Sequence, residues 1–188
     1  MSMTAPPGTS DRAILFLDFQ ATIVKNSRTV DAGSLAKHAT VLAKLAALHR
    51  IPAFISSVPP GGDFAPSILE ALGQKAQPRT FMSAFGDDQL VADLKASGRR
   101  TLILSGVVSE MVVQQTALDA LGAGYDVLVA VDACGGISDR TEDAAWRRIA
   151  GAGGSLTSVA SFGSELAGDL TSDIGRQTFG LVAETFKK

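Results

Sequence analysis

Short apolar runs alternate with segments of helical periodicity along the chain. The first run, AILFLDF at residues 13–19, is apolar with an acid near its end, which is typical of a buried strand in a parallel sheet. The predicted strands are residues 13–19, 52–57, 101–105, 126–131 and 155–160. The predicted helices are residues 34–49, 65–72, 87–97, 109–121, 140–150 and 172–188. Strands that alternate with helices predict an α/β fold with a parallel sheet and right-handed connections.

The helical segments carry signals for burial and for their ends. Asp87 or Asp88 is expected to cap the helix at 87–97, and Gly98 to end it. The first 12 residues are rich in Pro, Gly, Ser and Thr and are predicted to be flexible, whereas residues 13–188 are predicted to form one domain. The last helix is amphipathic, with apolar members Ile174, Phe179, Leu181, Val182 and Phe186.

Composition and charge narrow the functional classes. The 188 residues are 46% hydrophobic and 19% charged, as in a folded domain, and the net charge of −2 argues against nucleic acid as a partner. No apolar run approaches the ~20 residues of a membrane span, and no secretory signal opens the chain, so a cytoplasmic protein without membrane contact is expected. One cysteine, Cys134, and two histidines, His38 and His49, favour neither disulfides nor a metal site. We therefore predict no metal and no cofactor.

Three segments are expected at the edge of the sheet where ligands bind, outside the carboxyl ends of its strands. Asp18 and Gln20 end the first strand, and this carboxylate is either an acid or base or the cap of a turn. Residues 106–112 lead from a strand into a helix, where backbone N–H groups form either an anion site or an ordinary turn. In the loop at 78–86, Arg79 either reaches the pocket or is a solvated surface charge.

Three sequence blocks together resemble the isochorismatase-like family of cysteine hydrolases. They are ILFLDFQ, RTFMSAF and LILSGVVSEMVVQQTALDALGAGYDVLVAVDACGG, within a match that runs over about residues 13–160. The tail DRTEDAAWRRIAGAG…FGSEL is similar to the YcaC-type subgroup of small oligomeric hydrolases. The resemblance implies a single-domain, three-layer α/β/α fold with a central parallel sheet, and a homo-oligomer that acts on a small molecule.

The resemblance also implies a catalytic triad of Asp, Lys and Cys, of which this chain keeps one member. The family aspartate falls on Asp18, the family lysine on Arg79, and the family cysteine on Val112. A valine has no nucleophile, and an arginine stays protonated, so it relays no proton but can hold an anion. Cys134 is interpreted as a buried structural residue rather than a replacement nucleophile.

The remaining site residues are also implied by the resemblance. A cis peptide bond is expected between Val107 and Val108, beside an oxyanion hole of backbone N–H groups near Val112. The expected substrate-binding residues are Gln20, Phe19, Phe81, Phe85, Val107 and Val108.

Two functions remain open at this point. The first is an isochorismatase-family hydrolase that uses Asp18 for non-covalent acid–base chemistry, with Arg79 as an anion clamp. The second is a catalytically degenerate member, with an Asp18–Arg79 ion pair, that serves as a small-molecule-binding or structural oligomeric protein.

Overall fold

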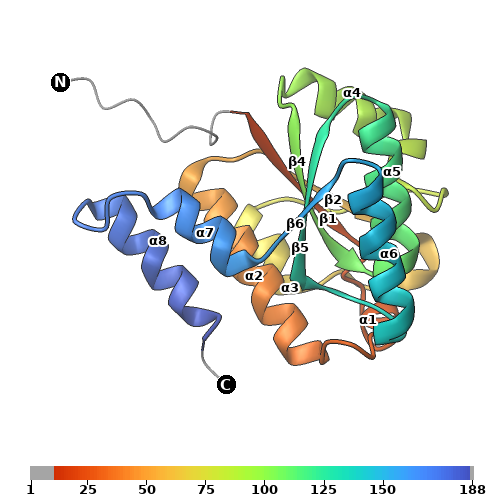
Figure 1. Cartoon of the computed structure of the whole chain (residues 1–188), viewed down its shortest axis with the longest axis horizontal. Coiled ribbons are helices and arrows are strands. Elements are labelled where there is room, and N and C mark those ends of the chain that lie inside the picture. The colour runs from red at the N-terminus through yellow and green to blue at the C-terminus, as the bar shows by residue number, and fades with distance from the viewer. Residues whose placement is uncertain (1–10, 187–188) are drawn as a thin grey trace.

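A computed structural model describes residues 11–186 as an α/β fold in three layers (Figure 1). Six parallel strands form one sheet in the order β3-β2-β1-β4-β5-β6. The strands are β1 (Arg12–Leu17), β2 (Ala53–Ser57), β3 (Gln77–Pro78), β4 (Thr101–Val107), β5 (Asp126–Gly135) and β6 (Ser155–Thr157). The α-helices are α1 (Ala21–Val24), α2 (Ala32–His49), α3 (Pro66–Leu72), α4 (Asp88–Ala96), α5 (Gln114–Gly122), α6 (Asp139–Gly151), α7 (Val159–Ala167) and α8 (Asp173–Glu184).

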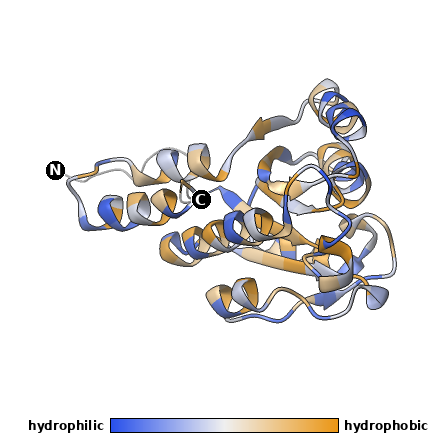
Figure 2. Cartoon of the chain, turned by 90° about the horizontal axis from the view of Figure 1, so that it is seen from below, coloured by the Kyte–Doolittle hydropathy of each residue, from blue (hydrophilic) through white to orange (hydrophobic). Residues whose placement is uncertain are grey.

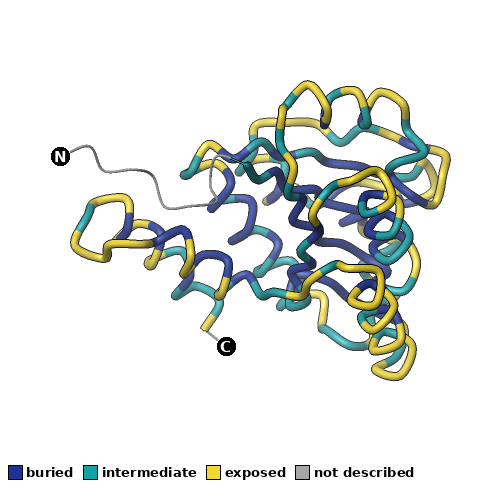
Figure 3. The backbone as a smooth tube through the Cα atoms, turned by 45° about the horizontal axis from the view of Figure 1, so that its top comes forward, coloured by how far each residue is buried: buried dark blue, intermediate teal, exposed yellow. Residues whose placement is uncertain are grey.

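Helices cover both faces of the sheet and enclose two layers of core. Side chains of β1 alternate between the layers: Ile14 and Phe16 pack with α2, α3 and α7, while Leu15 and Leu17 pack with α4, α5 and α6. Hydrophobic colour is concentrated in the strands, whereas the helices show both colours (Figure 2). The buried segments likewise form the centre of the molecule, with exposed backbone in loops and outer turns (Figure 3). The predicted three-layer fold is therefore confirmed.

The strand order places a topological switch between β1 and β4. The chain moves outward from β1 to β2 and β3, then crosses back to β4 on the other side of β1. In open parallel sheets ligands bind at such a point, outside the carboxyl ends of the strands. Leu17 of β1 lies opposite Gly106 of β4 at this edge. A Cβ atom on Gly106 would lie 2.6 Å from both the Cβ and the carbonyl oxygen of Leu17, so only glycine allows the two strands to approach in this way.

Most predicted elements are present, but several boundaries and one assignment are wrong. The segment 155–160 is a strand only to Thr157, because Ser158 caps a new helix by accepting a hydrogen bond from the backbone N–H of Ser161. The helix predicted at 109–121 opens with one π-helical turn, η3 (Ser109–Val113), before α5. Of the predicted flexible segment, residues 1–10 lie outside the described residues, and Arg12 already belongs to β1.

The C-terminal helix α8 is held to the body by polar as well as apolar contacts. His49, at the end of α2, lies with Nε2 at 2.7 Å from Thr178 Oγ1 of α8. The Thr178 hydroxyl donates its hydrogen to the carbonyl of Ile174, so His49 must be the donor in this pair. Lys44 of α2 forms an ion pair with Glu184 at 2.9 Å. No helix among residues 11–186 is long and apolar enough to cross a membrane.

Candidate active site

Asp18 stands at the end of β1 in a conformation that turns its carboxylate toward β2 and the loop after β3. Its φ of 56° lies in the left-handed region, which aspartate tolerates better than most residues. The backbone is fixed by a hydrogen bond from the Asp18 N–H to the carbonyl of Ser56, at 3.0 Å, and by one from the Gln20 N–H to the Asp18 carbonyl, at 2.7 Å. A left-handed residue at the end of a buried strand is typical of functional sites.

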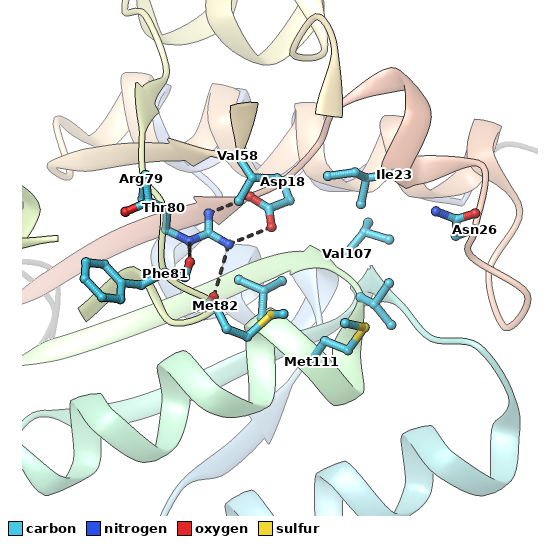
Figure 4. Close-up of a pocket in the computed structure, with 12 residues that line it drawn as sticks. Asp18, Ile23, Asn26, Val58, Arg79, Thr80, Phe81, Met82, Val107 and Met111 are labelled. Carbon is cyan, nitrogen blue, oxygen red and sulfur yellow. Dashed lines mark hydrogen bonds and ion pairs between the residues drawn. The ribbon is translucent and has the colours of Figure 1, made fainter. Parts of the chain in front are cut away.

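Arg79 meets Asp18 in a buried, two-pronged ion pair. Its Nη1 lies 2.6 Å from Asp18 Oδ1, and its Nη2 lies 2.7 Å from Asp18 Oδ2. The Arg79 side chain has no exposed surface, and that of Asp18 is 6% exposed. Burial raises the pKa of the Asp18 carboxyl, while the hydrogen bonds and the positive charge of Arg79 oppose the rise. Of the two alternatives for Arg79, the structure shows the one in which its side chain reaches the pocket, where it contacts Asp18 directly (Figure 4).

The guanidinium of Arg79 has no donor left for another anion. Besides the two bonds to Asp18, Nη1 donates to Ser56 Oγ at 3.2 Å. Nη2 donates to the carbonyl of Met82 at 3.2 Å, and Nε to that of Phe81 at 2.9 Å. These five bonds match the five N–H groups of an arginine. The expected role of Arg79 as an anion clamp is therefore wrong for this conformation: the side chain instead ties the loop after β3 to the ends of β1 and β2.

Asp18 and Arg79 line a cavity of about 290 Å³. Most of its walls are apolar, and most come from the carboxyl ends of the strands and the segments that follow them (Figure 4). The full lining is Asp18, Ile23, Asn26, Val58, Arg79, Thr80, Phe81, Met82, Val107, Val108, Met111 and Val112. Its volume lies near the lower end of the range for small-molecule sites, roughly 300–1,000 Å³.

The segment after β4 supplies the opposite wall. The peptide bond between Val107 and Val108 is cis, as the family resemblance predicts. Val112 is buried in η3 and lines the cavity with an apolar side chain. Two nearby backbone N–H groups, those of Met111 and Val113, donate to the Val108 carbonyl at 3.1 and 3.4 Å, so they are occupied within this turn.

Six of the nine expected site residues line the cavity: Asp18, Arg79, Val112, Phe81, Val107 and Val108. Gln20 does not, because its carboxamide bonds the backbone of Val58 and Gly62 and so fixes the loop after β2. Phe19 packs in the core against Phe16 and Phe64. Phe85 packs edge-on against Tyr125, with ring centroids 5.7 Å apart. For these three residues the expected place in the pocket is corrected.

Several lining residues were not expected from the sequence. Val58 follows β2 directly, and a systematic search of strand ends would have included it. Ile23 and Asn26 come from α1 and the turn after it, an element whose four residues gave no periodic signal. Ser56 also belongs to the site, because its hydroxyl accepts from Arg79. No cluster of three or more His, Cys, Asp or Glu side chains suited to a metal occurs in the described part of the chain.

A comparison with family models matches residues 12–161 to the isochorismatase domain. The chain belongs to the isochorismatase family. Within the family, it is 30% identical over 171 residues to the probable hydrolase YcaC of Escherichia coli, covering 88% of this chain and 82% of that protein.

Solved structures of family members have the same fold. YcaC from Pseudomonas aeruginosa, in a structure with hexane-2,5-diol and covalent acrylamide, superposes with a TM-score of 0.86 at 31% identity, covering 93% of this chain and 88% of that one. YcaC from E. coli, described as an octameric hydrolase of unknown specificity, superposes with a TM-score of 0.89 at 26% identity, covering 98% and 93% of the two chains. The resemblance to the YcaC-type subgroup is thus confirmed.

Proposed function

We propose that this protein is an isochorismatase-family hydrolase that acts on a small molecule by acid–base chemistry at Asp18, without a covalent intermediate. The observation that carries the proposal is that Asp18 and Val112 face one cavity. A carboxyl group is therefore available to move a proton, while the position where the family resemblance places a cysteine offers no nucleophile.

Asp18 retains the capacity for proton transfer despite its ion pair. Each carboxylate oxygen accepts one hydrogen bond from Arg79, and each has a second lone pair. Burial raises the pKa of Asp18. A carboxylate with a raised pKa is better able to take a proton from a water molecule and to return it to the leaving group. Arg79 holds the carboxylate in one orientation through its two parallel hydrogen bonds.

A second function is favoured by the saturation of Arg79. The two short bonds from the guanidinium make Asp18 a weaker base than an equally buried carboxylate without such a partner, because its charge is already compensated. This observation supports a degenerate member that binds a small molecule without turning it over. The two functions share the same pocket and differ in the behaviour of Asp18.

Turnover by the purified protein and by Asp18→Asn would separate them. The panel would hold small amides, carbamoyl compounds and isochorismate, with Asp63→Asn, a substitution of an exposed aspartate outside this cavity, as the matched control. We expect hydrolysis that is lost in Asp18→Asn and retained in Asp63→Asn. Equal activity in all three proteins would overturn the role of Asp18. Binding without turnover would establish the second function instead.

We also propose that the protein is a cytoplasmic homo-oligomer that uses the outer face of α8. Ile174 and Phe179 on this helix are 42% and 49% exposed, and Phe186 just after it is 65% exposed. Several large exposed apolar side chains on one terminal helix favour an interface there, and a relative, E. coli YcaC, is described as octameric. We expect light scattering to give a multiple of the 19.4 kDa chain mass and Phe179→Asp to reduce it. A monomer in both proteins would refute this assembly.

A further inference from the structure

The cavity beside Asp18 has an unusual charge balance. Its lining includes two charged residues, Asp18 and Arg79, and each is committed to the other. The rest of the wall is largely apolar, with Val58, Val107 and Met111 among its members. The site therefore combines a fully formed ion pair with walls that offer a ligand few polar partners.

An anionic ligand would find no free cation here. The side chain of Arg79 has no exposed surface, and its five N–H groups bond to Asp18, Ser56 and the carbonyls of Phe81 and Met82. A cationic ligand would find Asp18 already neutralised. Moving an ion from water into such a place is unfavourable unless a partner of opposite charge awaits it.

We propose that this cavity selects uncharged ligands with a small apolar body, and rejects both anions and cations of the same shape. The inference deepens the proposed function, since the ligand would be the substrate of that site. It concerns binding alone, however, so it holds or fails independently of turnover. It also separates this chain from any relative whose pocket contains a free basic group.

The test is to measure binding of three compounds that share a ring and differ in charge: benzamide, benzoate and benzylamine. Calorimetric titration of the intact protein at pH 7.5 would give the three dissociation constants. We expect benzamide to bind at least tenfold more tightly than either ion. Benzoate or benzylamine binding as tightly as benzamide would overturn the proposal, and so would the failure of benzamide to bind at millimolar concentration.

Two substitutions confirm which cavity is involved. Val112→Phe fills the cavity beside Asp18 and should abolish the binding of benzamide. Ala36→Phe fills a separate apolar cavity of about 300 Å³, beside α1 and α2, and should leave it unchanged. The reverse pattern would assign the binding to the second cavity and refute the proposal.

Two further substitutions test charge as the cause. Asp18→Asn removes the negative charge that compensates Arg79. The positive charge of Arg79 is then unbalanced, so benzoate should gain affinity relative to benzamide. Met111→Lys adds a cation at a partly exposed wall position and should do the same without touching the ion pair, which guards against misfolding of the first variant. Unchanged selectivity in both would overturn the electrostatic explanation. The expected selectivity without turnover of any compound would leave this proposal standing and overturn the proposed catalytic function.

Discussion

Replacing Arg79 by methionine is the most direct test of the buried ion pair between Arg79 and Asp18. The substitution keeps an unbranched apolar side chain but removes every hydrogen bond that the guanidinium makes, including both bonds to Asp18. Asp18 then remains as a buried carboxylate without its partner. Breaking a buried pair from one side costs about 3–5 kcal/mol, because the remaining charge is neither solvated nor compensated.

The size of the effect in a melting experiment follows from the length of the chain. For a protein of 188 residues, 1 kcal/mol lowers the melting temperature by roughly 2–4 °C, so the variant should melt about 6–20 °C below the parent protein. Circular dichroism at pH 7 measures this shift, and urea unfolding gives the free energy. A loss of less than about 1 kcal/mol, the range of exposed ion pairs, would refute the argument.

The same variant should respond to pH in a defined direction. Burial already raises the pKa of Asp18, and removal of Arg79 removes the groups that oppose this rise. A carboxyl with a raised pKa in the folded state favours folding below its unfolded pKa of about 3.9, and this contribution is lost as pH rises through the folded pKa. The deficit of Arg79→Met should therefore shrink on acidification. The loss of stability caused by Arg79→Met should also be smaller in the Asp18→Asn background, because no buried charge is then left without a partner.

Three other predictions address the nucleophile position, the strand contact and the helix interface. Val112→Cys places a thiol on the wall of the cavity beside Asp18 and should be alkylated by iodoacetamide. Cys134 of the native parent protein does not line this cavity, and burial raises the pKa of its thiol, so it should stay unmodified. Mass spectrometry distinguishes the two sites, and labelling of Cys134 would contradict the reasoning. Gly106→Ala should destabilise the protein by about 1–3 kcal/mol in urea unfolding, because the new Cβ meets the neighbouring strand, whereas Gly122→Ala has open space and should be near neutral. Burial lowers the pKa of His49, so on acidification the unfolded state takes up the proton before the folded state does. The free energy of unfolding should therefore fall as pH drops below about 6.5, the pKa of an unperturbed histidine. His49→Gln should flatten that part of the pH profile, and an unaltered profile would exclude His49 as the cause.

The local pattern of residues was sufficient to predict an α/β fold with a parallel sheet, whereas the three layers were implied by the family resemblance. Strand β1 is readable because its apolar run is buried on both faces, and α2 because its apolar residues recur at helical spacing. Helix α7 was missed because SLTSVA at 155–160 is a short mixed run that fits a strand as well as a helix. The choice is made at Ser158, whose side chain caps the helix, and a six-residue pattern does not reveal that contact.

The site was predictable in position but not in chemistry. Asp18 and Val112 follow β1 and β4, and parallel strands bring their carboxyl ends to one edge whatever the intervening sequence. The saturation of Arg79 depends on acceptors from three separated segments: Ser56, Asp18 and the carbonyls at Phe81 and Met82. No sequence spacing predicts such a set of acceptors. Arg79 was expected to bind a ligand, and in the structure it instead connects three segments of the protein.

An arginine at position 79 and a valine at position 112 are physically consistent with each other. A lysine ammonium is a compact point charge with three donors, whereas the arginine fork reaches both oxygens of Asp18 and three further acceptors. Those two hydrogen bonds to Asp18 would compete with a cysteine thiol at position 112 for the same carboxylate oxygens. Val112 has no polar group and needs no such hydrogen bond. Any proton that Asp18 accepts must then come from water or from the ligand itself. The largely apolar walls should limit how much water enters with a ligand. If the proposed acid–base chemistry holds, we therefore expect substitutions that add a polar group to this wall to change the rate of hydrolysis as well as the affinity for the ligand.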